Sequence, residues 1–313
     1  MNRIEKNSIL DMVILGGGPA GYTAALYAAR AGLSVLVLEK LSPGGQMALS
    51  HQIDNYPGFE AGIEGFTLAE KMEAQALRFG AVTELAEVLS TDLKTNPKVI
   101  STSEGTYYAK SVVIATGAVP RTLGLPEETS LTGRGVNYCA ACDGMFYQNK
   151  TVAVVGGGNS AAADALLLSR VAKKVFLVHR RDTLRAEKVY HRPLMEAENV
   201  EFRWNSEVTQ LLSGDRLTGI RLRNRLSGEE ETLSCDGVFI SVGRRPASQL
   251  FENQLALDGA GYIAADETTA TNIPGVFAVG DIRTKPLRQV VTAVADGAVA
   301  VHMAENYLAQ LEV

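Results

Sequence analysis

Two stretches decide the fold of this chain: Met12-Val13-Ile14-Leu15-Gly16-Gly17-Gly18-Pro19-Ala20-Gly21 and Val152-Ala153-Val154-Val155-Gly156-Gly157-Gly158-Asn159-Ser160-Ala161. In each stretch a short apolar run, typical of a buried strand, leads into a glycine-rich turn. A segment of helical character follows, and then a second apolar run, at 35–38 and at 175–178. The chain therefore contains a strand–helix–strand unit twice, about 140 residues apart.

Both turns have the glycine spacing that brings a backbone close to a pyrophosphate. The first glycine makes the sharp bend, the second lets the main chain approach the ligand, and the third position lets helix and strand pack closely. The free N–H groups of the helix N-terminus then face the phosphates. A glycine-rich turn in an unrelated α/β protein is the alternative, but two matches in one context favour two dinucleotide sites. We expect the first site to contain Gly16, Gly18, Pro19, Ala20 and Gly21, and the second Gly156, Gly158, Asn159 and Ser160.

The residues after the second strands distinguish the two sites. Glu39 lies 23 residues after Gly16, where an acid accepts hydrogen bonds from ribose hydroxyls. At the same offset from the second turn the chain has a basic cluster, which consists of His179, Arg180, Arg181 and Arg185. Guanidinium groups bind phosphate through charge-assisted, bidentate hydrogen bonds. The sequence thus predicts an adenine dinucleotide in the first site and NADP in the second. The alternative for the arginines is a solvent-exposed helix start.

The repeat predicts an α/β fold with two Rossmann-like, three-layer dinucleotide-binding domains. Residues 65–80 have the pattern of an amphipathic helix. Residues 82–108 and 201–233 are typical of antiparallel meanders, so each domain is expected to carry one.

The order of these segments predicts that one domain is inserted in the other. We expect residues 1–118 and 247–313 to form a discontinuous first domain, and residues 119–246 to form the inserted one. The linker signals are Pro120, Gly124, Pro126 and Arg245-Pro246.

Composition excludes several classes of protein. The 313 residues include 35 acidic and 30 basic side chains, and this mildly acidic balance argues against nucleic acid as the main partner. The sequence has no signal-peptide pattern at its start and no run of 18 apolar residues, so we expect no membrane span. Three cysteines cannot build a secreted disulfide framework, and we expect a cytoplasmic protein.

Two of the cysteines form the motif Cys139-Ala140-Ala141-Cys142. This spacing can cycle between dithiol and disulfide. Half of a zinc site is one alternative, but only Cys235 and four histidines remain to complete four ligands, and none forms a second pair. An inert pair is the other alternative. Cys235 itself is expected to be a small core residue.

Asp143 follows the second cysteine directly and could move a proton during thiol chemistry. The alternative is an Asx turn, because Asp143-Gly144 is a strong turn signal.

A redox-active cysteine pair beside two dinucleotide sites implies a path for electrons. Nicotinamide delivers two electrons as hydride, thiols do not accept hydride at useful rates, and a flavin can mediate between them. We therefore expect FAD in the first site, NADPH in the second, and the cysteines as the exit. We expect no metal site, because too few ligands remain beside the cysteine pair.

At this point the sequence resembles the low-molecular-weight, bacterial-type thioredoxin reductases. The resemblance spans nearly the whole chain and rests on residues 16–21, 44–46, 55–59, 115–117, 139–144, 156–161, 179–186, 280–281 and 288–289. It implies a homodimer in which an NADPH domain is inserted in an FAD domain. It also implies rotation of one domain relative to the other, with hinges near residues 119 and 246.

The resemblance also implies roles for individual residues. Beyond the first glycine turn it places these residues at FAD: Gly45, Gln46, Asn55, Ala115, Thr116, Gly117, Gly280, Asp281, Arg288, Gln289 and Val290. It implies that Cys142 faces the flavin, that Cys139 attacks the disulfide of a thioredoxin, and that Asp143 is the acid or base of the thiol step.

The sequence departs from the family pattern at two places. Ala141 stands where threonine is usual, and Ala163-Asp164 stands where two glutamates are common. Some relatives take electrons from ferredoxin, but the intact second turn and its arginines favour NADPH. Another small disulfide protein as acceptor, and a redox or NADP sensor without turnover, are the remaining alternatives.

Overall fold

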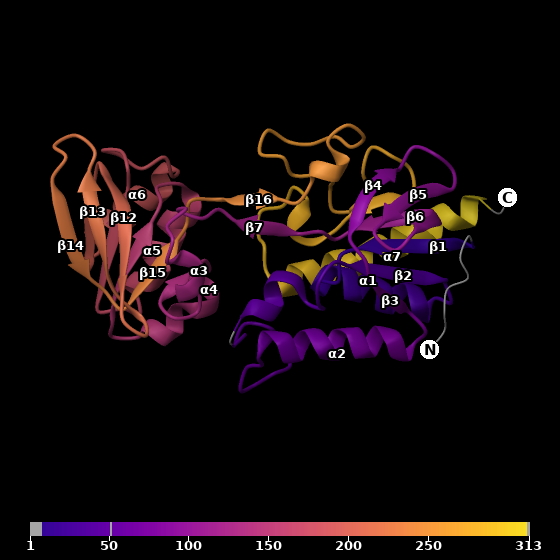
Figure 1. Ribbon diagram of the computed structural model, residues 1–313, viewed down its shortest axis with the longest axis horizontal. Helices are drawn as coiled ribbons and strands as arrows, with labels where there is room; N and C mark the ends of the chain where they lie inside the picture. The colour runs from indigo at the N-terminus through magenta and orange to yellow at the C-terminus, as the bar shows by residue number, and fades with distance from the viewer. Residues whose placement is uncertain (1–7, 51, 312–313) are drawn as a thin grey trace. The chain divides into compact units, whose positions relative to one another are not determined.

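The computed structural model describes residues 8–50 and 52–311, which divide into two compact units (Figure 1). Unit 1 contains the chain up to Val119 and again from Arg245, and unit 2 is Pro120–Arg244. The first division lies one residue after the boundary expected from the sequence, and the second lies two residues before it.

A mixed sheet forms the centre of unit 1. Its order is β3-β2-β1-β6-β5-β4, and β17 also pairs with β6. The central strands β1 and β2 run parallel, with Met12 opposite Val35. The strands are β1 (Ile9–Leu15), β2 (Val35–Glu39), β3 (Val82–Leu85), β4 (Val88–Asp92), β5 (Lys98–Thr102), β6 (Thr106–Ile114) and β17 (Val276–Ala278).

Alternating side chains of β1 and β2 fill two cores, one on each face of this sheet. Met12 and Ile14 pack under the helices on one face. Val13 and Leu15 pack on the other face against a segment that returns late in the chain, including Phe251. The helices are α1 (Pro19–Arg30), α2 (Gly65–Arg78) and α7 (Val290–Leu311), and short 3₁₀ turns occur at η1 (Gly45–Leu49), η3 (Gln249–Phe251) and η4 (Gly280–Ile282).

Unit 2 repeats the architecture with its own sheet, in the order β11-β10-β9-β15-β8. All its pairings are parallel. Its strands are β8 (Val136–Asn137), β9 (Thr151–Val155), β10 (Lys174–Val178), β11 (Val200–Arg203) and β15 (Gly237–Ile240). Its helices are α3 (Glu128–Leu131), α4 (Ala140–Asp143), α5 (Asn159–Ser169) and α6 (Lys188–Glu196), with a 3₁₀ turn at η2 (Gly144–Tyr147).

An antiparallel sheet of three strands covers the second face of this unit. It consists of β12 (Ser206–Ser213), β13 (Leu217–Asn224) and β14 (Glu230–Ser234). Leu211, Leu222 and Leu233 pack against Phe176 and Val178 of the parallel sheet. Ala161, Ala165 and Leu168 of α5 fill the opposite face, so the unit has three layers.

The predicted fold class is confirmed, and the extent of the meanders differs from prediction. Residues 82–85 and 201–203 were expected to begin the meanders, but β3 and β11, which contain them, pair parallel with β2 and β10. Each of them follows a helix, and a strand that returns after a helical crossover lies parallel to its neighbour. In unit 1 the remaining strands β4 and β5 continue the main sheet instead of forming a separate layer.

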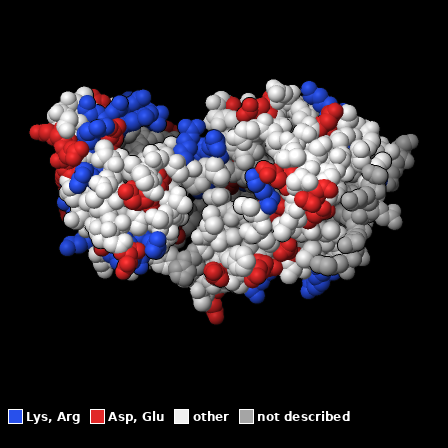
Figure 2. All heavy atoms as spheres, viewed as in Figure 1, with Lys and Arg blue, Asp and Glu red and all other residues white. Residues whose placement is uncertain are grey.

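The chain passes between the units along β7 (Ala118–Pro120) and β16 (Arg244–Pro246), which pair as a two-stranded sheet (Figure 1). Arg121 donates its N–H to the carbonyl oxygen of Gly243 at 2.9 Å. On the face drawn in Figure 2, acidic and basic side chains are interspersed. No helix in the described part of the chain has the length and apolar character needed to cross a membrane.

Candidate active site

Cys139 and Cys142 are joined by a disulfide, with their Cα atoms 5.3 Å apart. Cys139 is the N-cap of α4, and its carbonyl oxygen accepts the N–H groups of Cys142 and Asp143 at 3.2 and 3.0 Å. Both cysteines are half-buried. Among the described residues, no group of three or more His, Cys, Asp or Glu side chains could hold a metal ion. Cys235 is buried, and burial raises the pKa of its thiol to about 12.

Asp143 has the electrostatic character of a proton-transfer group. It is half-buried, and burial raises the pKa of its carboxyl group to about 6. Its side chain does not cap the 3₁₀ turn η2 that follows it. An acid with a pKa near neutrality can both donate and accept a proton under physiological conditions.

The first glycine turn is closed by contacts that only glycine permits. Gly16 has φ +106°, and a Cβ atom there would lie 2.6 Å from the carbonyl oxygen of Ala115. A Cβ atom on Gly21 would lie 2.0 Å from the carbonyl oxygen of Gly16. By contrast, the space around Gly18 is open within 4 Å. Gly18 is the N-cap of α1 and has no side chain, so the N–H groups of the first helical turn remain available for a phosphate.

Glu39 lies beside this turn at the end of β2. Its Oε2 accepts the N–H of Gly17 at 2.7 Å, and its Oε1 accepts the N–H of Leu41 at 3.1 Å. Each carboxylate oxygen has a second lone pair, so both can still accept from a ribose hydroxyl. The position therefore fits the predicted role.

The structure brings residues from distant parts of unit 1 to the same turn. A Cβ atom on Gly45 would come within 3.9 Å of Gly18, and one on Gly280 would lie 3.1 Å from the Cβ of Ala20. Gly44, which precedes Gly45 and Gln46, donates its N–H to the carbonyl oxygen of Gly17 at 2.7 Å.

Further pairings hold the remaining predicted residues of unit 1. Asn55 donates from Nδ2 to Oε1 of Gln289 at 3.0 Å, although the two are 234 positions apart. The Thr116 hydroxyl donates to the carbonyl oxygen of Ala247, and the N–H of Ala247 donates to the carbonyl oxygen of Gly117. Val290, the first residue of α7, packs with the cluster that contains Met47 of η1.

Arg288 and its surroundings fit a bound cofactor. The Arg288 guanidinium lies over the ring of Tyr262, 4.0 Å from the ring centre, and Nη2 donates to the carbonyl oxygen of Arg283. Its Nε is buried and has no hydrogen-bond partner in the described chain. Asp296 of α7 accepts the N–H of Gly280 at 2.8 Å and so holds the turn that carries Asp281. Buried donors without partners are rare, and a polar ligand at this place would satisfy Nε.

The second glycine turn has the same construction in unit 2. A Cβ atom on Gly156, at φ +152°, would lie 2.4 Å from the carbonyl oxygen of Ser241. Gly158 is surrounded by open space and is the N-cap of α5. Asn159, the first helical residue, exchanges two hydrogen bonds of 2.8 Å with Glu187. Ser160 is exposed.

The predicted basic cluster separates into one buried and three exposed side chains. Arg180, Arg181 and Arg185 are exposed, and the described residues offer them no ion pair. The His179 ring is buried against Gly157, at the position that a Cβ atom of this glycine would take. Burial, followed by the positive charges of the three arginines, lowers the pKa of His179 below its usual value. The arginines are thus the side chains free to meet a phosphate, and His179 supports the turn.

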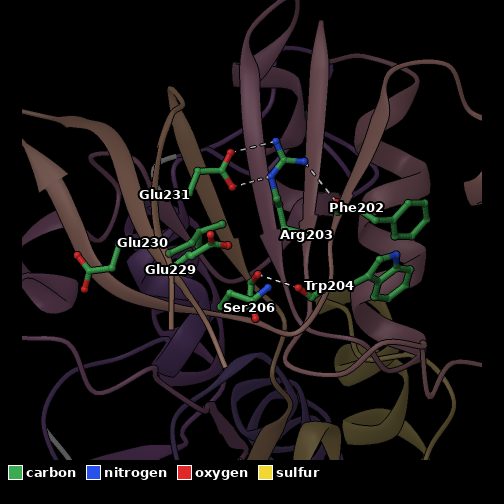
Figure 3. A pocket seen from close by; sticks show the side chains of 9 residues that line it. Phe202, Arg203, Trp204, Ser206, Glu229, Glu230 and Glu231 are labelled. Carbon is green, nitrogen blue, oxygen red and sulfur yellow. Dashed lines mark hydrogen bonds and ion pairs between the residues drawn. The ribbon is translucent and has the colours of Figure 1, made fainter. Parts of the chain in front are cut away.

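The sequence did not predict which residues hold the loop 179–185 that carries the basic cluster. The N–H of His179 bonds to the carbonyl oxygen of Arg203, and the N–H of Ser206 bonds to that of His179. Trp204 meets the His179 ring edge to face and stacks on Phe202. Phe202 and Trp204 also line a cavity of about 510 Å³, beside which Arg203 and Glu231 form an ion pair of 2.9 Å (Figure 3). These contacts join β11 and β12 to the loop that begins at His179. The one signal for them in the sequence is the presence of a single tryptophan, Trp204.

Asp164, at the position where the family pattern departs, also has a partner. It accepts a hydrogen bond from the hydroxyl of Ser241, which directly follows β15. Burial raises the pKa of Asp164 above its usual value.

Comparison with known proteins identifies the group to which this site belongs. The family model described as pyridine nucleotide-disulphide oxidoreductase matches residues 10–297. The chain belongs to the pyridine nucleotide-disulphide oxidoreductase family. Its membership makes the chain an oxidoreductase that binds a flavin and a nicotinamide nucleotide.

Individual members of the pyridine nucleotide-disulphide oxidoreductase family resemble the chain along nearly its whole length. A thioredoxin reductase of Listeria monocytogenes is 44% identical over 309 residues, covering 98% of this chain and 97% of the relative. One of Streptomyces clavuligerus is 45% identical over 308 residues, covering 97% and 96%. The crystal structure of thioredoxin reductase from Streptococcus pyogenes matches with a TM-score of 0.90 at 42% identity, covering 97% of this chain and all of that one.

Proposed function

We propose that this protein is a thioredoxin-disulfide reductase, which takes two electrons from NADPH and delivers them to oxidised thioredoxin. One observation carries the proposal: a half-buried disulfide, followed by a carboxyl group with a pKa of about 6, lies in the same unit as an open glycine turn with three exposed arginines. The relatives named thioredoxin reductase, which cover nearly the whole chain, support it.

Unit 1 is the proposed FAD domain, for which the sequence predicted residues 1–118 and 247–313. The first turn of α1 offers its N–H groups to the pyrophosphate, and Glu39 accepts from the ribose. Arg288 has a buried Nε free to donate to the cofactor. The other FAD-binding residues are Gly16, Gly18, Pro19, Ala20, Gly21, Gly45, Gln46, Asn55, Ala115, Thr116, Gly117, Gly280, Asp281, Gln289 and Val290. When bound, FAD accepts a hydride and passes its two electrons to sulfur.

Unit 2 is the proposed NADPH domain, for which the sequence predicted residues 119–246. Gly156, Gly158, Asn159 and Ser160 form the turn that would hold the pyrophosphate. Arg180, Arg181 and Arg185 bind the 2′-phosphate, which distinguishes NADPH from NADH. His179 holds the turn from beneath through Gly157.

We assign the steps of the disulfide chemistry to three side chains, in the roles that the family resemblance implies. Two electrons and two protons convert the Cys139–Cys142 disulfide to a dithiol. The Cys139 thiolate then attacks the thioredoxin disulfide, and a mixed disulfide forms as one thioredoxin thiolate leaves. Cys142 attacks Cys139 of this mixed disulfide, which re-forms the internal bond and releases the second thiolate. Asp143 accepts the proton of the attacking thiol and donates it to the leaving thiolate.

The two half-reactions require the disulfide to meet both the flavin and a protein. Rotation of unit 2 about the segments near 119 and 246 meets this need, and two connections between the units leave it possible. We further propose a homodimer, on the resemblance, and a cytoplasmic location, where thiols are kept reduced. Light scattering of the purified protein tests the first, and cell fractionation tests the second.

Anaerobic titration tests the proposed function. NADPH should bleach the flavin absorbance, and oxidised thioredoxin should restore it with release of thioredoxin thiols. Parallel reactions with NADH, reduced ferredoxin and a glutaredoxin-like disulfide protein identify the donor and the acceptor. Protein that contains no flavin and cannot be reconstituted with it would refute the proposal.

A further inference from the structure

Glu128 is a buried acidic side chain that the proposed chemistry does not use. It is the first residue of α3 and is 2% exposed. A buried carboxylate is costly unless hydrogen bonds satisfy its oxygens. Its partners in unit 2 are backbone N–H groups and one phenol, and they lie on two different segments of the chain.

The first segment wraps around the carboxylate. Oε2 of Glu128 accepts the N–H groups of Leu123, Gly124 and Leu125 at 2.9, 3.0 and 3.4 Å, and Oε1 also accepts that of Leu123 at 3.1 Å. Gly124 has φ +80°, a left-handed conformation that glycine adopts without strain. Successive N–H groups in such a bend form a concavity that binds anions. Here the anion belongs to the chain itself and fixes the segment that follows β7.

The second segment is the start of the redox loop. The hydroxyl of Tyr138 donates to Oε1 of Glu128 at 2.6 Å, and Tyr138 directly precedes Cys139. Burial, together with the nearby Glu128 carboxylate, raises the pKa of Tyr138 above its usual value, so the hydroxyl stays a donor. One carboxylate therefore holds the residue before the disulfide and the segment 123–125 at the same time.

The contacts continue to the second connection between the units. Arg121, two residues before Leu123, donates its N–H to the carbonyl oxygen of Gly243, next to β16. A continuous series of bonds thus leads from Cys139 through Tyr138 and Glu128 to both segments that enter and leave unit 2.

We propose that Glu128 is a positioning residue that passes the redox state of the Cys139–Cys142 disulfide to the connecting segment 121–125. Reduction by dithiothreitol adds two electrons and two protons, breaks the S–S bond, and closes the reductant to its cyclic disulfide. The sulfurs must then separate, because atoms that are no longer bonded cannot stay at bonding distance. Cys139 relaxes, Tyr138 moves with it, and the hold of Glu128 on the segment loosens. The inference rests on the proposed function for the redox activity of the disulfide.

Hydrogen exchange measured by mass spectrometry tests this proposal on the flavin-loaded protein, with dithiothreitol as reductant and without nucleotide or thioredoxin. The N–H groups of Leu123–Leu125 donate to the Glu128 carboxylate, and hydrogen bonds to charged groups are among the stronger ones. Loosening of these bonds should therefore speed the exchange of the three amide hydrogens about tenfold. We expect this increase on reduction of the unmodified protein. Cys142→Ser, which cannot form the disulfide, should exchange rapidly with and without reductant, which excludes a direct effect of dithiothreitol.

Tyr138→Phe removes only the hydroxyl that joins the two segments. In this variant we expect fast exchange at Leu123–Leu125 in the oxidised state and no further change on reduction. Tyr190→Phe is the matched control, since it removes a hydroxyl on α6 of the same unit and should keep the redox response.

Two results would overturn the proposal: equal exchange of the oxidised and reduced unmodified protein at 123–125, or a redox response that survives in Tyr138→Phe. A purely structural role of the hydroxyl would raise exchange in both redox states and preserve their difference. The measurement needs no partner protein, so a failure of thioredoxin turnover with an intact exchange response would reject the proposed function alone.

Discussion

Replacing Asp143 by asparagine should make the protein more stable and less active. Burial raises the pKa of this carboxyl group from 3.8 to about 6, and a shift of that size corresponds to roughly 3 kcal/mol. Because the side chain is only half-buried, screening by solvent reduces the expected effect on the free energy of unfolding to about 1–2 kcal/mol.

The sign follows from which form burial disfavours. Burial in the folded protein disfavours the charged carboxylate. The resulting loss of folding stability is therefore present above pH 6, where the carboxyl group is ionised in the folded and the unfolded state. It disappears below about pH 4, where the group is protonated in both. Asp143→Asn should therefore exceed the unmodified protein in stability at pH 8 and match it near pH 4. Urea denaturation at the two pH values measures this difference, and Asp215→Asn, an exposed acid of the same unit, should show no gain.

Activity should change in the opposite direction. General acid–base catalysis contributes about 10²- to 10⁴-fold, so thioredoxin reduction by Asp143→Asn should fall by at least a hundredfold. Flavin reduction by NADPH, followed by stopped-flow absorbance, should remain unchanged. Undiminished thioredoxin turnover would show that this carboxyl group does not carry the proton. Equal stability of the two proteins at pH 8 would show that burial does not destabilise its charged form.

Three further groups of substitutions test the other parts of the site. Cys139→Ser or Cys142→Ser should abolish thioredoxin reduction and leave flavin bleaching by NADPH intact, and turnover in either variant would reject the assignment. Combined Arg180→Ala and Arg181→Ala should raise KM for NADPH at least about tenfold, because charge-assisted bonds to the 2′-phosphate are lost. KM for NADH should hardly change, and an equal rise for both nucleotides would give these arginines a structural role instead. Gly16→Ala should cost several kcal/mol of stability and eliminate bound FAD, since a methyl group would lie 2.6 Å from a backbone carbonyl at the end of β6. Thermal unfolding and the flavin content of the purified variant measure both effects.

The parts of the site that the sequence predicted depend on neighbours along the chain. The turns at Gly16 and Gly156 can be predicted because the turn itself requires this spacing of glycines. The pair Cys139 and Cys142 can be predicted because a separation of three residues suits a disulfide. The position of helix α2 follows equally from the apolar periodicity of residues 65–80.

The parts that escaped prediction depend on contacts across the fold. Val82 and Val200 begin short strands whose composition fits a meander or a parallel sheet equally well, and only the preceding helical crossover decides. In the sequence Glu128 is indistinguishable from an exposed acid in a polar segment. Its burial and its backbone N–H partners depend on the fold and produce no pattern in the residue spacing. His179 stands in a basic run, and its burial against Gly157 follows from the packing of the turn.

Pairing of β7 with β16 has a consequence for how such a protein could arise. The two ends of unit 2 lie side by side, so the chain of unit 1 is interrupted at a single place, and the strands β6 and β17 on either side of the insertion still pair. Modules with adjacent ends can be spliced into a surface loop without pulling the recipient apart. An ancestral gene could therefore have acquired the whole second module in one event, and a short bridging turn in place of residues 121–243 would restore an uninterrupted recipient.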